Sequence, residues 1–276
     1  MKRTISSVAI LVSACSALSA QGLDFVKWLD YPAPGIPRTA DGKADLAAKA
    51  PRTPDGKPDL SGMWAVQRPG DRPGRPVYDI TAFLAPGSQM SMKPEAEALF
   101  KKRQPFDSTL RTTEPKPNCL PMGPVLEAYD GGTELVQTRA FVVVMGSWNA
   151  KFRKIYIDGR GLPNDPDPSF DGYSAGHWDG DTLIVDTIGV NDRSWLDIGG
   201  HPISEAAKIT ERYTRRDFGH MTVQITVDDP TNYTKPWTIV INKILRPDTT
   251  ELISYCLENE KDLSRIQKAN EAGRNK

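Results

Sequence analysis

The strongest constraint on the fold of this chain is an alternation of apolar and polar residues that fills its second half. From Glu134 onward this two-residue period, which is typical of half-buried β-strands, recurs in segment after segment. Turn-forming pairs such as Asp179-Gly180 and Asp229-Pro230 separate the segments, and no helix-length pattern lies between them. Because parallel strands need long crossovers, which are usually helical, this order favours sequential antiparallel strands.

These segments predict an all-β fold, either an antiparallel barrel or a closely related sandwich. One or two short helices are expected beside it. Residues 93–103 have the pattern of a helix, with acidic residues leading and basic residues trailing. The polar residues 258–276 are the second helical candidate. The expected strands are residues 63–67, 134–138, 140–146, 152–158, 182–188, 207–216, 221–228, 237–245 and 251–256.

The 276 residues are enough for one large domain. The N-terminal part is proline-rich and lacks the apolar alternation of the second half. An approximate repeat reads PRTADGKADL at 37–46 and PRTPDGKPDL at 51–60. Each copy places Asp-Gly at a turn and offers little apolar surface, so we expect an extended arm that lies on the domain or links it to a membrane anchor. The expected organisation is a signal peptide at 1–20, a proline-rich arm at 21–60, the barrel-like domain at 61–259 and a polar tail at 260–276.

The first residues predict export. Lys2 and Arg3 precede an apolar stretch, and Leu18-Ser19-Ala20 offers a small-residue cleavage site, as in a signal peptide. A rival site exists, because Val12-Ser13-Ala14-Cys15 is similar to a bacterial lipobox and would leave a lipidated N-terminus. We therefore expect a periplasmic or secreted protein, or alternatively an outer-membrane lipoprotein anchored through Cys15.

Two cysteines, Cys119 and Cys256, lie beyond the leader. In an oxidising compartment an even number favours a disulfide, which here would close a long loop. Two buried free thiols are the alternative.

The balance of charge excludes one class of partner. The chain has 35 basic and 35 acidic residues, and its formal net charge is +0. Nucleic-acid-binding domains favour a strongly basic face, so we expect no nucleic-acid partner. The expected partner is a small-molecule ligand or substrate, and a membrane is reached only through a lipid at Cys15.

Two of the expected strands carry polar residues on both faces, which suggests a ligand site. In a barrel, strands such as 152–158 and 208–216 would line a lumen or mouth with polar side chains; surface ion pairing is the alternative. Asp158-Gly159-Arg160 suits a carboxylate or sugar hydroxyls, unless its two charged side chains pair with each other. The candidate ligand-binding residues are Tyr156, Asp158, Arg160, Tyr173, His177, Glu211 and Arg212.

The segment from Gly172 to Gly176 reads GYSAG and matches the G-x-S-x-G pattern of serine hydrolases. That pattern indicates a nucleophile when the serine lies on a turn between a strand and a helix. Here a loop precedes it and a hairpin signal follows it. The pattern alone therefore assigns no chemical role to Ser174.

The three histidines, His177, His201 and His220, are candidates for metal binding or acid/base chemistry. They are widely separated, unlike the closely spaced ligands of a zinc site, so we expect no metal and no cofactor. His201 precedes a strand at the expected rim, which suits a general acid or base; a capping or surface role is the alternative. If the chain is an enzyme, the candidate catalytic residues are His201, Asp158 and Arg160.

Several phrases resemble an uncharacterised family of secreted bacterial β-rich proteins, across about Asp59 to Asn259. The resemblance implies secretion and a β-rich fold, and it supplies no catalytic residues. Relatives often carry histidine where this chain has Ile203, which counts against catalysis by this segment. Separately, Gly62-Met63-Trp64 is similar to the G-x-W start of lipocalins and implies a calycin-like barrel. The phrases are PDLSGMW, CLPMG, FRKIYIDGR, GYSAGHWDGDTLIVDTIG, ITERY, DDPTNYTKPW and YCLEN.

Together these features predict an exported protein that binds an amphipathic or carbohydrate-like small molecule in the mouth of a barrel. The alternative is a cofactor-free lyase, isomerase or hydrolase with acid/base residues at the barrel rim.

Overall fold

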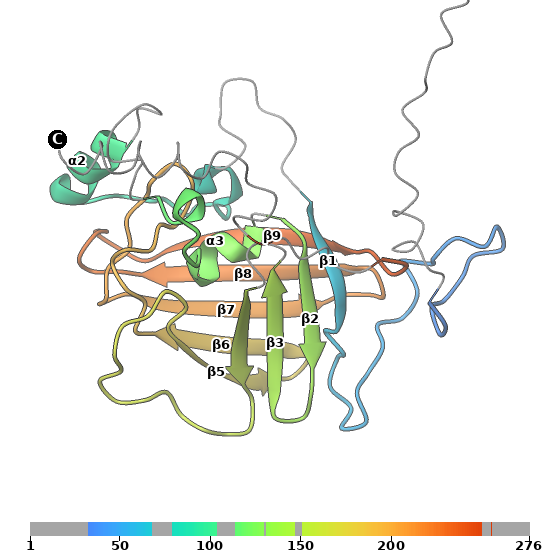
Figure 1. Cartoon of the computed structure of the whole chain (residues 1–276). Helices are drawn as coiled ribbons and strands as arrows, with labels where there is room; N and C mark the ends of the chain where they lie inside the picture. Colours follow the sequence, from blue (N-terminus) through green and yellow to red (C-terminus); the bar gives the residue numbers. More distant parts are fainter. Residues whose placement is uncertain are drawn as a thin grey trace, which may run out of the picture.

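The computed structural model describes residues 33–67, 79–103, 114–129, 131–146, 151–249 and 255. Within them the strands β1 to β9 follow one another around a closed barrel in chain order (Figure 1). The all-β barrel expected from the alternating sequence is thus confirmed. The strands are β1 Gly62–Gln67, β2 Thr133–Gln137, β3 Phe141–Gly146, β4 Phe152–Tyr156, β5 Tyr173–Asp179, β6 Thr182–Ile188, β7 Lys208–Arg215, β8 His220–Asp228 and β9 Trp237–Leu245.

One pair of neighbouring strands departs from the expected antiparallel order. β4 and β5 run parallel and are paired only through Ile155 with Ser174 and Tyr156 with Ala175. The other neighbouring strands, including the closing pair β1 and β9, are antiparallel. Residues 157–172 make the crossover that a parallel pair requires, and they do so without a helix. With two residue pairs, this contact is the shortest one between neighbouring strands of the barrel.

The barrel core contains the inward-facing apolar residues of successive strands. Trp64 on β1 is fully buried, and its Nε1 donates to the carbonyl of Leu60 at 2.9 Å. The guanidinium of Arg215 lies 4.9 Å from the Trp64 ring centroid and donates to the carbonyls of Asp59 and Phe218. These contacts fix β1 where the arm enters the barrel. Core residues include Val142, Val144, Ile155, Leu183, Val185, Ile209, Val223, Ile225, Val227, Ile239 and Ile241.

Short helices cover one end of the barrel (Figure 1). The expected helix is present as α2, Pro94–Arg103, with Glu95 and Glu97 in its first turn. A second α-helix, α3, Gly123–Tyr129, was not expected, and every one of its residues is buried. Two 3-10 turns, η1 Ile80–Phe83 and η3 Lys116–Asn118, lie before α2 and before α3. None of the described helices has the length and apolarity needed to span a membrane.

The described part of the arm is not extended but folds into two similar turns. In each copy of the repeat an isolated bridge closes the turn, between Arg38 and Ala44 and between Arg52 and Pro58. The arginine of each copy also forms a two-pronged ion pair with a barrel turn. Arg38 pairs with Asp248 at 2.6 Å, and Arg52 pairs with Asp181 at 2.5 Å. The described part of the arm therefore lies on the barrel, which was one of the two expectations for the arm.

Several predictions fall on residues that the structure does not describe. These predictions are the signal peptide, lipidation at Cys15, the strand 251–256 apart from Tyr255, and the polar tail. Cys256 lies there too, whereas Cys119 has a left-handed backbone conformation (φ 58°) at the end of η3. The pairing of Cys119 with Cys256 stays a prediction from the sequence.

Candidate functional site

Three of the candidate ligand-binding residues lie together in a groove on the outer wall of the barrel. Tyr156, Arg160 and Tyr173 line a cavity of about 320 Å³, which we call the wall groove. Small-molecule pockets typically measure about 300–1,000 Å³, so this groove has room for a small ligand. The other residues of the wall groove are Lys154, Gly161, Leu162, Pro163, Gly172, Ser174 and Ala175.

The alternation of β4 and β5 places these side chains on the outside. On β4, Arg153 and Ile155 are buried within the barrel, whereas Lys154 is exposed and Tyr156 is half-buried. The crossover reaches β5 through Gly172, whose φ is +61° and whose hypothetical Cβ would lie 2.5 Å from the carbonyl oxygen of Ile188. Glycine is therefore needed at this edge of the groove.

Arg160 is held in the groove by two neighbours. Its Nη2 lies 2.7 Å from Oδ2 of Asp158 and its Nε 3.0 Å from Oδ1, and its guanidinium is 3.8 Å from the Tyr156 ring centroid. The hydrogen bonds from Arg160 hold the pKa of Asp158 below its usual value. The two charged side chains thus pair with each other, which was the structural alternative. The pairing also presents a guanidinium on an aromatic face at the groove.

Glu211 lies in the barrel interior, away from this groove. It is fully buried and accepts two hydrogen bonds from Arg153, at 2.7 and 2.9 Å. Tyr213 donates to it at 2.7 Å, and burial raises the pKa of that phenol well above its usual value. Ser174 accepts from Arg153 at 3.2 Å and bonds Thr187 at 2.8 Å. Side chains fill this part of the lumen, and Ser174 is one of them rather than an exposed nucleophile.

The remaining candidates, His177 and Arg212, lie on the outer wall beyond the groove. His177 is exposed on β5. Arg212 on β7 is 42% exposed and lies 3.8 Å from Asp179. Adjacent residues of β7 face opposite sides of the wall, so Glu211 and Arg212 do not form one site.

A second ionic cluster lies under the helices at one barrel end. Lys151 Nζ lies 2.6 Å from Asp171 and 3.6 Å from Glu127 of α3. Both carboxylate oxygens of Glu127 are buried without a hydrogen bond, and burial raises the pKa of Glu127. This cluster ties α3 to the barrel, with Glu127 and Lys151 buried and Asp171 partly exposed at its edge.

His201 belongs to a third region, the buried loop between β6 and β7. Its Nδ1 lies 2.6 Å from Oδ2 of Asp197, its backbone N–H donates to Oδ1 of Asp197 at 2.9 Å, and its ring stacks on Phe100 at 4.1 Å. Arg103 stacks on Trp195 at 4.4 Å, and burial lowers the pKa of Arg103 to about 10. No hydrogen bond or ion pair among the described residues joins His201 to the Asp158–Arg160 pair. The three candidate catalytic residues are therefore not assembled into one site.

Asp79 brings a further carboxylate to His201 and Asp197. Ligand atoms of Asp79, Asp197 and His201 lie within 4.8 Å of one another. However, Asp79 Oδ1 accepts from the N–H of Thr81 at 2.9 Å, and Asp197 Oδ2 accepts from the N–H of Ile80 at 3.2 Å. These hydrogen bonds account for the arrangement as a cap on η1, so we assign no metal to it.

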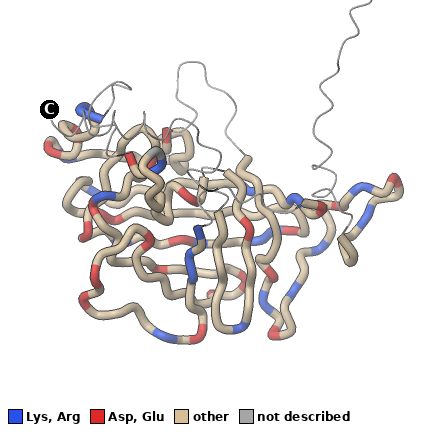
Figure 2. The backbone as a smooth tube through the Cα atoms, viewed as in Figure 1, with Lys and Arg blue, Asp and Glu red and all other residues tan. Residues whose placement is uncertain are grey.

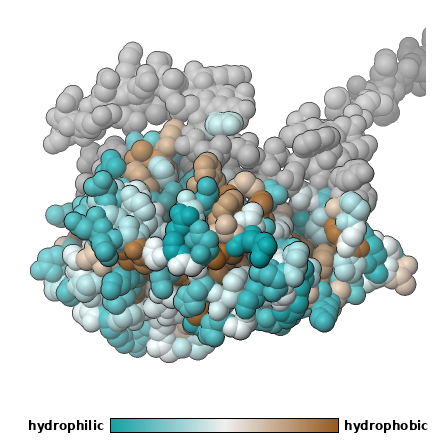
Figure 3. Space-filling model, turned by 90° about the horizontal axis from the view of Figure 1, so that it is seen from below, coloured by the Kyte–Doolittle hydropathy of each residue, from teal (hydrophilic) through white to brown (hydrophobic). Residues whose placement is uncertain are grey.

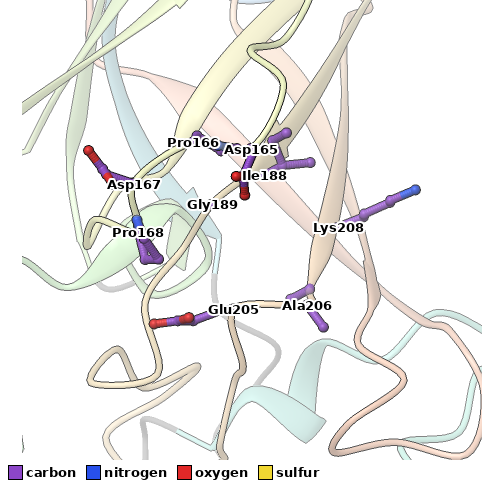
Figure 4. Close-up of a pocket in the computed structure, with 10 residues that line it drawn as sticks. Asp165, Pro166, Asp167, Pro168, Ile188, Gly189, Glu205, Ala206 and Lys208 are labelled. Atoms are coloured by element: carbon purple, nitrogen blue, oxygen red, sulfur yellow. The ribbon is translucent and has the colours of Figure 1, made fainter.

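A larger cavity of about 440 Å³ lies between residues 165–168 of the crossover, the end of β6 and residues 205–208 (Figure 4). Asp165 and Glu205 stand on opposite sides of it, and Lys208 extends away. Its carboxylates are exposed, and no buried polar group among its lining residues selects a ligand. The crossover thus borders two cavities, the wall groove through residues 160–163 and this one through residues 165–168.

Comparison with family models, with curated proteins and with solved structures gives no match to this chain.

Sequence reasoning missed several residues of the wall groove, of the buried loop around His201 and of the barrel interior. Leu162 and Pro163 supply the apolar part of the wall groove, and the sequence offered only their place in a proline-rich loop. The contact between Asp197 and His201 was easier to anticipate, because the two residues are four apart in sequence. That spacing, however, predicts a contact only within a helix. Arg153 alternates with Tyr156 and Lys154 along the strand, but its partner Glu211 is distant in sequence.

Proposed function

We propose that this chain is an exported protein that binds an amphipathic or carbohydrate-like small molecule in the wall groove. The observation that carries the proposal is the convergence of Tyr156, Tyr173 and Arg160 on one cavity of suitable size. Ligand sites are commonly lined by aromatic and apolar side chains with a few polar groups that fix orientation. The groove has this composition, whereas buried side chains fill the lumen around Glu211. The proposal therefore places the ligand on the outer wall instead of in the barrel mouth.

Export through a cleaved signal peptide, or anchoring through Cys15, is part of the same proposal and is supported by the composition of residues 1–20. An exported binder would meet its ligand outside the cytoplasm. The exposed position of Tyr173, at 39%, suits direct capture from solution.

Native mass spectrometry of the protein purified from its own cells tests the binding function. We expect wild type to carry a small molecule of defined mass and Tyr173→Ala to lose most of it, because the substitution removes one aromatic wall of the groove. His177→Ala is the matched control, since His177 is exposed on the same strand but does not line the groove. Equal occupancy in wild type and Tyr173→Ala would contradict the proposal.

A second candidate function, a cofactor-free acid/base enzyme, is favoured by the His201–Asp197 pair. A buried carboxylate on Nδ1 fixes the protonated nitrogen of the imidazole and leaves Nε2 to accept a proton. Asp197 would act as the positioning residue, in place of the Asp158 expected from the sequence.

A further inference from the structure

The charge of the wall groove narrows the class of ligand. Lys154 and Arg160 line it, and no carboxylate is among its lining residues. Elsewhere the chain intersperses charges of both signs (Figure 2). Asp158 pairs with Arg160 but does not line the groove, so the lining itself carries positive charge and no negative charge.

Both cations are available to an anion. Lys154 has no carboxylate within ion-pair distance among the described residues; its Nζ lies 4.9 Å from the ring centroid of Phe141 and 5.8 Å from that of Tyr156. The hydrogen bonds of Arg160 to Asp158 engage Nε and Nη2. Asp158 occupies the Nε and Nη2 edge of Arg160, so the donors offered to an oxyanion are Nη1 of Arg160 and the ammonium of Lys154. Charge-assisted hydrogen bonds of this kind are among the stronger ones.

The same wall also carries apolar side chains beside the two cations. Phe152, 63% exposed, stands on β4 in line with Lys154 and Tyr156, and Phe141 of β3 pairs with Tyr156 across the sheet. Leu162 lies in the groove itself. The face shown in Figure 3 has separate hydrophobic patches within a hydrophilic surface.

We infer that the wall groove takes an amphipathic organic anion, a flat ring system that bears a carboxylate or sulfonate. The rings lie against Tyr173 and Leu162, and the acid group faces Arg160 and Lys154, which lie beside the Tyr156 ring. This inference rests on the proposed function and chooses among its ligands: it favours an amphipathic acid over an uncharged sugar.

Two fluorescent probes separate charge from apolar contact. 8-Anilinonaphthalene-1-sulfonate carries a negative charge, and N-phenyl-1-naphthylamine has similar rings without one. In titrations of the full exported protein we expect Arg160→Gln and Lys154→Gln each to weaken sulfonate binding by about tenfold, the equivalent of one charge-assisted contact, and to leave the neutral probe unchanged. Added salt should weaken binding of the sulfonate alone.

Tyr173→Ala and Arg212→Gln complete the experiment. Tyr173→Ala should weaken both probes, whereas Arg212→Gln should change neither, because Arg212 lies on the outer wall away from the groove. Sulfonate binding that is unchanged in Arg160→Gln and Lys154→Gln, or an equal loss of both probes, would overturn the anion inference while binding in the groove stood. If Tyr173→Ala affected neither probe, the wall groove would not be the site and the proposed function would fail with it.

Discussion

Replacing Arg153 by methionine is expected to destabilise the barrel by about 3–5 kcal/mol, because it leaves the carboxylate of Glu211 buried without its partner. Glu211 is fully buried and Arg153 is 4% exposed. For a chain of this size each kcal/mol lowers Tm by about 2–4 °C. Thermal and guanidinium unfolding should therefore show a large shift in the midpoint.

The double variant Arg153→Met/Glu211→Leu tests whether the loss of stability comes from the unpaired charge of Glu211 or from the loss of the Arg153 side chain itself. Since it removes both charges together, we expect it to recover most of the lost stability and to lie within about 2 kcal/mol of wild type. Arg212→Met, on the same strand as Glu211 but exposed, is the control and should change stability by less than about 0.5 kcal/mol. A single variant as stable as wild type would show that Glu211 is reached by water.

Apolar alternation predicted the barrel because it reports burial directly, one residue at a time. It failed at β5, where GYSAGHW looks like a loop. Gly176 explains the failure: a Cβ there would lie 3.1 Å from the carbonyl oxygen of Ile184 and 3.2 Å from Ile157. Close packing of β5 against its neighbours requires glycine at this position, and glycine counts neither as apolar nor as polar in an alternation pattern. The missing strand also hid the parallel pairing with β4.

The sequence did not predict which polar residues face the barrel interior and which face its outer wall. Residues on both faces of β4 and β7 are polar, so periodicity does not say which face points inward. The structure places Glu211 with Arg153 inside and Tyr156 with Arg160 outside, and each arrangement depends on a contact between strands or with the crossover. The local pair of Asp158 and Arg160 was the exception, because two residues separated by one glycine can meet without the rest of the fold.

Asp197→Asn is expected to lower stability by about 2–3 kcal/mol and to change the tautomer of His201. Asp197 accepts from the backbone N–H groups of Ile80 and His201 and from the imidazole of His201, and it is fully buried. An amide offers one acceptor oxygen, so one buried donor loses its partner, at a cost of about 1–3 kcal/mol each. Nitrogen-15 NMR of the imidazole should show Nδ1 protonated in wild type and a shift toward Nε2 in the variant.

The chain provides a matched control in the pair of His220 and Asp217, whose atoms lie 2.7 Å apart near the surface. Asp217→Asn removes the same kind of contact where water can replace it, and we expect a loss of about 0.5 kcal/mol. If Asp197→Asn and Asp217→Asn lower stability equally, burial is not the reason for the strength of the Asp197–His201 contact. If a reaction is found for this protein, turnover that falls in both Asp197→Asn and His201→Ala, but not in Asp217→Asn, would assign the acid/base role to the buried pair. Unchanged turnover in His201→Ala would leave this pair with a purely structural role, because its contacts already fix the loop between β6 and β7 against η1 at the covered end of the barrel.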